Sequence, residues 1–351
     1  MNALCDIHGL RLRMTGLTDA AVPDINTRLH WFEVPEGGGP ADLEVAVGPF
    51  EPDLAGCLAL DRRYWARPGY LYVEEGDKGL SWRAEIDGLE RGAGEPLRIR
   101  FAHGPWNRRR IPWLLFPDVI LHLYILWPIL ECELAARGLY LVHAGAVERD
   151  GRALFVAGRG GVNKTAAVAE LVRRGWRPMS DDFVLLGRGP AGETRVHAFP
   201  TSPRWFEFQL RHMEREDLSL VDKLRLLRVL YRRRDVGVEF VREARLEQVA
   251  VVHTVEGRTH PEATPLAPDA AAESLELNCR MERTSYVGLK FIIGRFLEAY
   301  PYVVPESTYG REWEALGPAL VALLRGASCR RIDTGVRYDR RLVDLLEPAD
   351  R

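Results

Sequence analysis

The chain has 351 residues, of which 46% are hydrophobic and 28% are charged, and its formal net charge is -2. This composition is that of an ordinary folded protein, and the length suffices for two domains that each bury a core. The near-neutral charge argues against a general nucleic-acid-binding role, because such proteins carry an excess of Lys and Arg. The short arginine clusters at 108–110 and 232–234 are better explained as solvated surface or as contacts to acidic groups.

The cysteines and the N-terminal residues bear on the cellular compartment. The five cysteines are scattered and form no C-x-x-C pair, so neither a disulfide framework nor a zinc site is predicted. Residues 1–10 contain Asp6 and His8 and no long apolar run, unlike a secretory signal. We therefore expect a cytoplasmic protein.

Residues 1–110 are predicted to form an N-terminal, antiparallel β-rich domain. Apolar and polar side chains alternate at period two in four segments, at 42–47, 70–73, 82–86 and 97–101. Glycine-rich turn sequences separate the strands of this region. No catalytic cluster is evident in this domain.

Residues 111–130 are strongly apolar but carry Pro117, Asp118, His122 and Pro128. Only about ten residues, at 119–127, run between the aspartate and the last proline, whereas a membrane-spanning helix needs about twenty. We expect no stable membrane span, but a buried helix over 117–137 that packs on the sheet of the second domain and is capped by Gly138. Peripheral contact with a membrane surface is the alternative.

The most informative run is 158–165, with the sequence Gly-Arg-Gly-Gly-Val-Asn-Lys-Thr, between an apolar segment at 153–157 and a helix-forming segment at 166–174. A strand, a glycine-rich loop and Lys-Thr at the start of a helix form the pattern of a phosphate-binding loop. In such a loop, backbone N–H groups surround an anion and the helix N-terminus adds partial positive charge. The predicted nucleotide-binding residues are Gly158, Arg159, Gly160, Gly161, Val162, Asn163, Lys164, Thr165 and Ala166.

Two residues of this loop have predicted roles with ATP, and one departs from the pattern. Lys164 would reach the β- and γ-phosphates, and the hydroxyl of Thr165 would hold Mg²⁺. The pattern G-x-x-x-x-G-K-[ST] has glycine where this chain has Asn163. Asparagine tolerates left-handed backbone dihedrals better than most residues, so it suits the tight turn. A loop that keeps the fold but binds nucleotide weakly is the alternative interpretation.

Residues 111–351 are predicted to form a nucleotide-binding α/β domain. Strands are expected at 140–147, 153–157, 183–186, 249–253 and 329–334. Helices are expected at 164–174, within 205–247, at 286–300 and at 312–324, and a loop at 256–272.

Three further side chains are predicted to gather at the loop. His143 lies on the strand before the loop strand, and the turn at 149–151 brings the two strands side by side. Asp181 and Asp182 precede the strand after the loop helix, which in a βαβ unit lies next to the loop strand. One carboxylate would orient a metal ion and the other would accept a proton. The alternatives are a turn-capping role for the aspartates and a core position for His143.

The order and spacing of these segments resemble the catalytic domain of HPr kinase/phosphorylase. The resemblance rests on 143–147, the loop with Lys164, 170–175 and 180–182, and it extends over about 139–187 but not over 1–110. It implies a P-loop core of the type shared by HPr kinase and the phosphoenolpyruvate carboxykinases.

The resemblance also implies roles for individual residues. It makes Asp181 the general base, places Asp182 with Thr165 at the metal, and places His143 beside the transferred phosphate. Arg204, Glu207, Arg280 and Arg283 are weaker candidates for contacts with substrate, metal or the transition state.

We therefore expect an ATP- and Mg²⁺-dependent kinase that transfers the γ-phosphoryl group to a hydroxyl of a small molecule, or to a Ser or Thr of a peptide or protein. No segment matches the family's region for HPr recognition, so HPr is not the expected acceptor. Asn163 motivates one alternative, a non-catalytic nucleotide-binding scaffold. A carboxykinase-like lyase is a third option, and the oligomeric state stays open, a homo-oligomer included.

Overall fold

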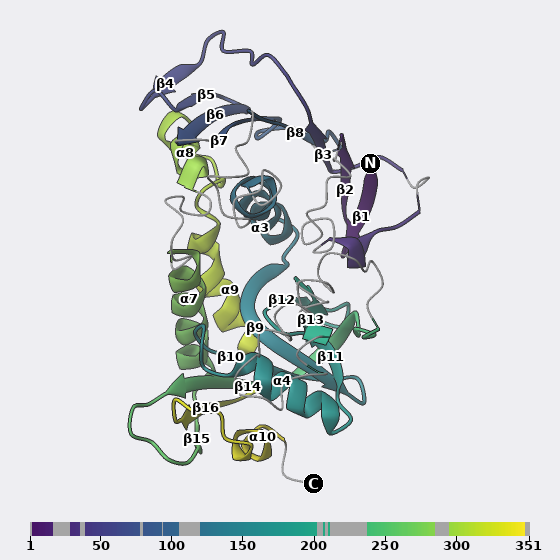
Figure 1. The fold of residues 1–351 in the computed structure, drawn as a ribbon, viewed down its shortest axis with the longest axis vertical. Coiled ribbons are helices and arrows are strands. Elements are labelled where there is room, and N and C mark those ends of the chain that lie inside the picture. The colour runs from purple at the N-terminus through teal and green to yellow at the C-terminus, as the bar shows by residue number, and fades with distance from the viewer. Residues whose placement is uncertain are drawn as a thin grey trace. The chain divides into compact units, whose positions relative to one another are not determined.

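The computed structural model describes residues 2–16, 29–35, 39–77, 80–92, 94–104, 120–201, 206–207, 210, 237–284 and 295–347. The chain is a mixed α/β protein with two multi-stranded sheets, one in each of two compact units (Figure 1). The first unit is Met1–Leu134 with Gly288–Glu312, and the second is Ala135–Val287 with Trp313–Arg351. The boundary therefore differs from the predicted one at residue 110, because a helical segment and a later segment both join the first unit.

The sheet of the first unit has the strand order β1-β2-β3-β8-β7-β6-β5-β4 within the described residues. Its strands are β1 Ala3–Ile7, β2 Leu10–Thr15, β3 Leu43–Val47, β4 Leu58–Leu60, β5 Tyr64–Arg67, β6 Tyr70–Asp77, β7 Leu80–Asp87 and β8 Leu97–His103. All four segments with period-two alternation form strands, which confirms the pattern. The prediction of a purely antiparallel sheet is wrong, because β3 pairs in parallel with both β2 and β8. The long connection between β3 and β8, which contains β4 to β7, permits this parallel return.

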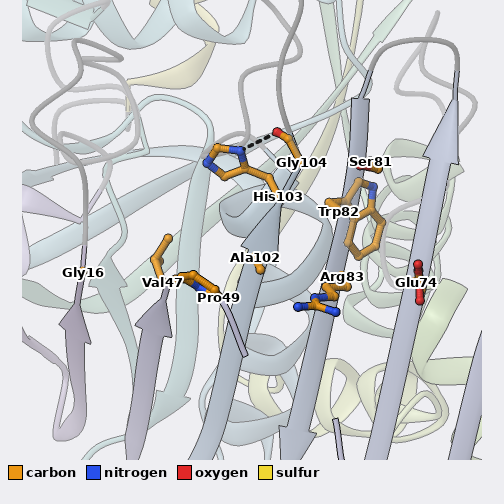
Figure 2. A pocket seen from close by; sticks show the side chains of 11 residues that line it. Gly16, Val47, Pro49, Glu74, Ser81, Trp82, Arg83, Ala102, His103 and Gly104 are labelled. Atoms are coloured by element: carbon orange, nitrogen blue, oxygen red, sulfur yellow. Dashed lines mark hydrogen bonds between the residues drawn. The ribbon is translucent and has the colours of Figure 1, made fainter. Parts of the chain in front are cut away.

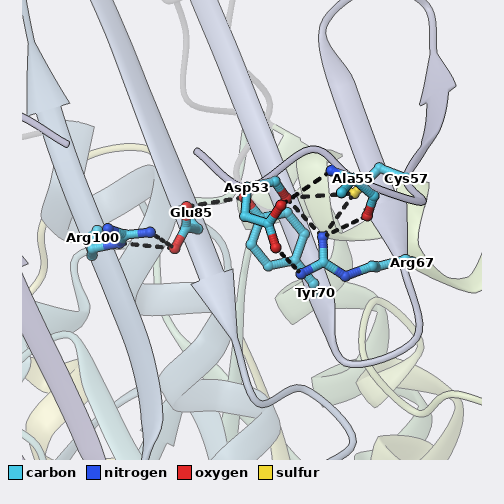
Figure 3. A network of polar contacts seen from close by, with 7 residues as sticks. All are labelled: Asp53, Ala55, Cys57, Arg67, Tyr70, Glu85 and Arg100. Carbon is cyan, nitrogen blue, oxygen red and sulfur yellow. Dashed lines mark hydrogen bonds and ion pairs between the residues drawn. The ribbon is translucent and has the colours of Figure 1, made fainter. Parts of the chain in front are cut away.

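Buried charges of the first sheet are held in polar networks (Figure 3). The Tyr70 hydroxyl donates to Glu85 at 2.9 Å, and Nε of Arg100 donates to the same carboxylate at 2.8 Å. Nearby, Arg67 donates to the carbonyl of Asp53 at 2.7 Å. The first two contacts link the neighbouring strands β6, β7 and β8, and the third attaches the segment before β4 to β5, so their role is to hold the sheet together.

The apolar segment after residue 120 is helical and belongs to the first unit, not to the second domain as predicted. A π-helical segment, Ile120–Leu126, continues into α3, Trp127–Ala135, and Gly138 follows with φ 73°. Residues 117–119 of the predicted helix lie outside the described residues. Within the part of the chain that is described, no helix is both long and apolar enough to cross a membrane.

The sheet of the second unit has the order β10-β9-β12-β13-β14-β16-β15, with β11 paired to β9 and β10 paired also to β14. Strands β9, β12, β13, β14 and β10 therefore pair in a closed ring. The strands of this sheet are β9 Tyr140–Arg149, β10 Arg152–Ala157, β11 Arg177–Ser180, β12 Phe183–Arg188, β13 Thr194–Ala198, β14 Glu243–Thr254, β15 Glu262–Pro265 and β16 Ser328–Thr334. The turn between β9 and β10 has positive φ at Asp150 (53°) and Gly151 (76°), which a tight hairpin requires.

The predicted neighbour of the loop strand is wrong. The strand predicted to follow the loop helix is β12, which comes after the short β11. Both β11 and β12 pair antiparallel with β9, whereas β10 has β9 and the parallel β14 as its neighbours. The aspartates thus approach the loop across β9. On β9, Ala144 is paired with Ala157 of β10, and His143 is paired with Phe183 of β12.

Helix α4, Lys164–Arg173, packs on β9 at a glycine. A Cβ at Gly145 would lie 2.6 Å from Cγ2 of Val168 and 3.2 Å from the carbonyl oxygen of Asp181. Glycine at this position therefore lets both the helix and the aspartate segment approach the strand. Gly175, with φ 91°, ends the helix as predicted.

The remaining helices only partly match the sequence-based prediction. Helix α9, Glu312–Leu324, has the predicted bounds. The predicted loop at 256–272 is wrong, because it contains β15 and the start of α7, Pro268–Thr284, where proline occupies a favoured first-turn position. The helix predicted over 205–247 is also wrong at its C-terminal end, since residues 237–242 are not helical and β14 begins at Glu243. Residues 211–236 lie outside the described residues. Of the predicted helix at 286–300, the described part forms a 3-10 turn, Arg295–Glu298, and the start of α8, Ala299–Val303. Helix α10 is Arg341–Leu346.

Candidate functional site

The loop between β10 and α4 turns through left-handed backbone conformations. Gly161 has φ 86°, and Asn163 has φ 65° and ψ 22° at the N-cap of α4. Asn163 thus adopts the conformation for which glycine or asparagine is suited, which explains the departure from the glycine pattern. A Cβ at Gly158 would lie 2.5 Å from the carbonyl oxygen of Val252, so β14 requires glycine at the start of the loop.

Lys164 lies in the first turn of α4 and is 6% exposed. Its Nζ donates to the carbonyl oxygens of Gly158 at 2.7 Å and Arg159 at 3.0 Å. Burial lowers the pKa of Lys164, while the negative charges of Asp182, Glu282 and Asp181 raise it, and the net direction is downward. The ammonium is therefore the positive centre of a largely acidic cluster.

The other predicted loop residues surround this lysine. Arg159, Gly160 and Gly161 are exposed to solvent, whereas Val162 and Ala166 are buried in the interior of the second unit. Thr165 follows Lys164 in the first helical turn and is half-buried. The exposed glycines leave the loop backbone accessible to a ligand, which is what a phosphate site requires.

His143 and Asp182 meet across two neighbouring strands. Nε2 of His143 lies 2.9 Å from Oδ1 of Asp182, and the imidazole ring lies against Phe183 with ring centroids 5.0 Å apart. His143 is buried, whereas the side chain of Asp182 is 43% exposed. The histidine thus fixes a carboxylate that solvent and ligands can still reach.

Asp181 lies in the interior beside this pair. It is 3% exposed, and its Oδ1 has no hydrogen-bond partner within the described parts of the chain. Burial, and secondarily the charge of Asp182, raise the pKa of Asp181 to about 8, although Lys164 acts in the opposite direction. A buried carboxyl that titrates near neutrality is characteristic of functional sites.

Helix α7 brings three further residues to this cluster that the sequence analysis did not name. Nδ2 of Asn278 donates to the carbonyl oxygen of His143 at 3.2 Å. The backbone N–H of His143 lies 3.5 Å from Sγ of Cys279. Oε1 of Glu282 accepts the N–H of Gly160 at 2.8 Å. The spacing of Asn278 and Glu282, four residues apart in a segment with helical periodicity, is the sequence signal that could have identified them.

The weaker candidates lie elsewhere or outside the described residues. Arg280 pairs with Glu276 at 2.7 Å on the exposed side of α7. Glu207 is buried and accepts the backbone N–H of Gly237 at 3.1 Å. Arg204 and the side chain of Arg283 lie outside the described residues.

A groove of about 420 Å³ lies at one end of the first unit's sheet (Figure 2). It is lined among others by Trp82, Arg83, His103 and Glu74. Nε1 of Trp82 is buried without a hydrogen-bond partner among the described residues. The groove offers a binding surface, but its lining contains no counterpart of the lysine–aspartate cluster.

Within the described ranges, no group of three or more His, Cys, Asp and Glu has the geometry of a metal site. This is compatible with Mg²⁺, which proteins commonly bind through one or two carboxylates together with the phosphates of a substrate. Asp182 and Thr165, the predicted metal ligands, both carry side-chain oxygen atoms of this kind.

Comparisons with known proteins add little. No protein-family model matches the chain, and no curated protein matches it. Among solved structures, the HPr(Ser) kinase/phosphatase from Coxiella burnetii matches with 14% identity and a TM-score of 0.20. The match covers 32% of this chain and 65% of that structure. A likeness of this size does not establish an activity.

Proposed function

We propose that this chain is an ATP-dependent phosphotransferase whose residues 158–166 bind the nucleotide and whose Asp181 and Asp182 face the transferred phosphoryl group. One observation carries the proposal. A buried lysine at the start of the loop helix interacts electrostatically with both aspartates, one of which is hydrogen-bonded to His143. Phosphoryl transfer needs a cation that binds the phosphates, a carboxylate that binds the metal ion and a carboxylate that accepts a proton, all close to one another.

The nucleotide would be held by the loop backbone and Lys164. The left-handed turns at Gly161 and Asn163 direct the chain into the N-terminus of α4, where unpaired N–H groups and the helix dipole favour a phosphate. Lys164 would exchange its two carbonyl partners for phosphate oxygens. The interactions with phosphate are charge-assisted and thus stronger than the bonds to neutral carbonyls.

Thr165 and Asp182 would hold Mg²⁺, which when bound would neutralise charge that develops on the phosphates. The hydrogen bond from His143 fixes the orientation of the Asp182 carboxylate. Its partial exposure leaves room for a ligand and for water in the coordination shell. His143 therefore serves as a positioning residue in this proposal.

Asp181 would accept the proton of the attacking hydroxyl. A carboxyl with a pKa of about 8 holds a proton more firmly than an ordinary aspartate, which makes its ionised form a stronger base. The unpartnered Oδ1 of Asp181 is the atom available for that proton. The acceptor is a hydroxyl of a small molecule or of a Ser or Thr side chain, as the sequence resemblance implies.

One observation favours the alternative of a nucleotide-binding scaffold without catalysis. Both carbonyl contacts of Lys164 and the contact of Glu282 with Gly160 engage groups that a triphosphate would need. A protein that binds nucleotide through a minor open population would bind it weakly.

Measurement of ATP turnover and of transfer from labelled ATP to fractionated extract tests the proposal. We expect Lys164→Ala to reduce nucleotide binding and transfer, and Asp181→Asn to abolish transfer while leaving binding intact. Asp269→Asn, at an exposed position on α7, is the matched control and should behave like the wild type. Native transfer rates in Lys164→Ala and Asp181→Asn would falsify the proposal. Binding without transfer in the wild type would favour the scaffold.

A further inference from the structure

The carboxylate of Glu282, near the end of α7, contacts the glycine-rich loop. Its Oε1 accepts the backbone N–H of Gly160 at 2.8 Å and lies 3.7 Å from Nδ1 of His143. The side chain is 21% exposed, so the contact is partly shielded from water. A negative charge of the chain itself thus accepts a backbone N–H of the kind that binds anions in phosphate loops.

The positive group of the loop is engaged in the same arrangement. Lys164 is buried, and its Nζ donates to the carbonyl oxygens of Gly158 and Arg159. Glu282 and Lys164 also attract one another electrostatically. A phosphate that binds in the loop must therefore exchange partners at the lysine and at Gly160.

The position of Glu282 is set by its helix. Helix α7 packs against β9, β14 and β16, and Ala271, Ala272 and Leu275 are buried. Asn278 lies one turn before Glu282 on the same helical face and donates to the carbonyl oxygen of His143 at 3.2 Å. The last turn of α7 is thus anchored beside the loop, and the carboxylate is delivered there by the fold.

We propose that Glu282 is an internal competitor for the loop, which a phosphate must displace in order to bind. This inference rests on the proposed function, because it presupposes that the loop binds phosphate. A terminal phosphate carries more charge and more acceptor oxygens than a carboxylate, so a di- or triphosphate can displace Glu282. The apparent affinity is then reduced by the fraction of molecules in which the loop is released.

A supporting role for Glu282 has the opposite consequence. If its hydrogen bond merely holds the loop in the shape that binds phosphate, removal of the carboxylate weakens binding. Competition and support therefore predict opposite signs for the same substitution.

Calorimetric titration of the full-length chain with pyrophosphate, ADP and adenosine tests the proposal. Glu282→Gln removes the negative charge with little change in side-chain volume. Glu282→Asp keeps the charge, but its side chain is shorter by one methylene group, so the carboxylate lies farther from the loop. Glu273→Gln, at an exposed position on the same helix, is the control. We expect Glu282→Gln to bind pyrophosphate and ADP about tenfold more tightly than the wild type, because the loop is released. Glu282→Asp should gain less, and Glu273→Gln should gain nothing. Adenosine has no phosphate and should be insensitive to every substitution.

The outcomes separate this proposal from the one on which it rests. If the wild type binds ADP and the Glu282 variants bind it equally or more weakly, Glu282 is not a competitor, but the nucleotide site stands. If neither the wild type nor any variant binds pyrophosphate or ADP, the loop is not a phosphate site and both proposals fall. Thermal unfolding of each variant identifies misfolding, and Glu282→Asp, with the smaller change, then decides the question.

Discussion

Buried carboxylates have different surroundings in the two units. In the first unit, Glu85 and Glu133 each interact with one tyrosine and one arginine. In the second unit, Asp181 is equally buried, but its Oδ1 has no partner among the described residues. The first arrangement satisfies a buried charge, and the second leaves an oxygen of a buried carboxyl group without a partner.

This difference suggests a criterion for distinguishing buried carboxylates that stabilise the fold from those that take part in a reaction. A buried carboxylate that interacts with an arginine and a hydroxyl is held in place, and it links the elements that carry its partners. A buried carboxyl without such partners costs stability, and its pKa moves toward neutrality. Such a cost is typical of sites where a proton must move. The predictions below test whether the two kinds of carboxylate differ in this way.

The largest expected effect is on phosphoryl transfer in Asp181→Asn. Loss of a positioned general base lowers the rate by about 10²–10⁴-fold. Single-turnover transfer from labelled ATP measures it, with nucleotide affinity determined in parallel. An unchanged affinity with a lost rate assigns Asp181 to chemistry, whereas an unchanged rate removes it from the mechanism. The same assay on Asp182→Asn distinguishes the proton acceptor from the metal ligand.

In the first unit, substitution should affect stability. Glu133→Ala leaves the half-buried Arg91 without its 2.7 Å partner. We expect a loss of about 3–5 kcal/mol in the free energy of unfolding, because an unpaired charge then remains in the interior. Glu44→Gln is the control, since Glu44 pairs with Arg13 on the exposed surface and should cost about 0–1 kcal/mol. Urea unfolding of both variants measures the difference, and equal losses would contradict the structural role.

The pH dependence of stability should identify Asp181 directly. Burial first, and Asp182 second, raise its pKa from 3.8 to about 8 in the folded chain. The protonated carboxyl thus stabilises the fold fully below pH 3.8, and this contribution is lost as the pH rises through about 8. Asp181→Asn lacks this loss, so it should exceed the wild type by about 2–4 kcal/mol at alkaline pH. Melting temperatures between pH 5 and pH 9 measure the gap, which should widen with pH. A constant gap would show that Asp181 does not titrate in this range.

The close approach at Gly145 permits a smaller, local test. In Gly145→Ala the new methyl group would lie 2.6 Å from Cγ2 of Val168, so α4 must shift. We expect a cost of about 1–3 kcal/mol, together with reduced nucleotide affinity, because the loop moves with the helix. Gly92→Ala is the control, since a Cβ there meets nothing within 4 Å. Loss of affinity without loss of stability would point to a direct role of Gly145 in the site.

Local features of the sequence predicted the loop and its flanking elements well. Period-two and helical patterns, glycine ends and the Lys-Thr pair are signals within a few residues, and β10, α4 and the β9–β10 hairpin have nearly the expected bounds. The conformation of Asn163 was likewise predictable, because it depends on the residue's own dihedral preferences.

Long-range pairing was not predictable in the same way. The choice of β9 instead of β10 as the neighbour of β12 depends on contacts across the whole sheet, and no residue near Asp181 indicates it. Glu282 meets Gly160 over a separation of 122 residues, on a helix whose proline-rich start reads as a loop. The sequence therefore predicted which residues could do chemistry, but not which others would lie against them.

The smallest expected effect concerns the loop position where the chain departs from the glycine pattern. Asn163 adopts φ 65° and ψ 22°, which glycine adopts without strain and alanine adopts at a cost of about 1 kcal/mol. Asn163→Gly should therefore change stability by less than about 1 kcal/mol and nucleotide affinity by only a few-fold, whereas Asn163→Ala should lose stability. Thermal unfolding and ADP titration of both variants measure these differences. If Asn163→Gly raises transfer strongly, the side chain itself restrains the site, and the scaffold interpretation gains support. If glycine and asparagine are equivalent, only the backbone conformation matters at this position, and the departure from the pattern has no consequence for function.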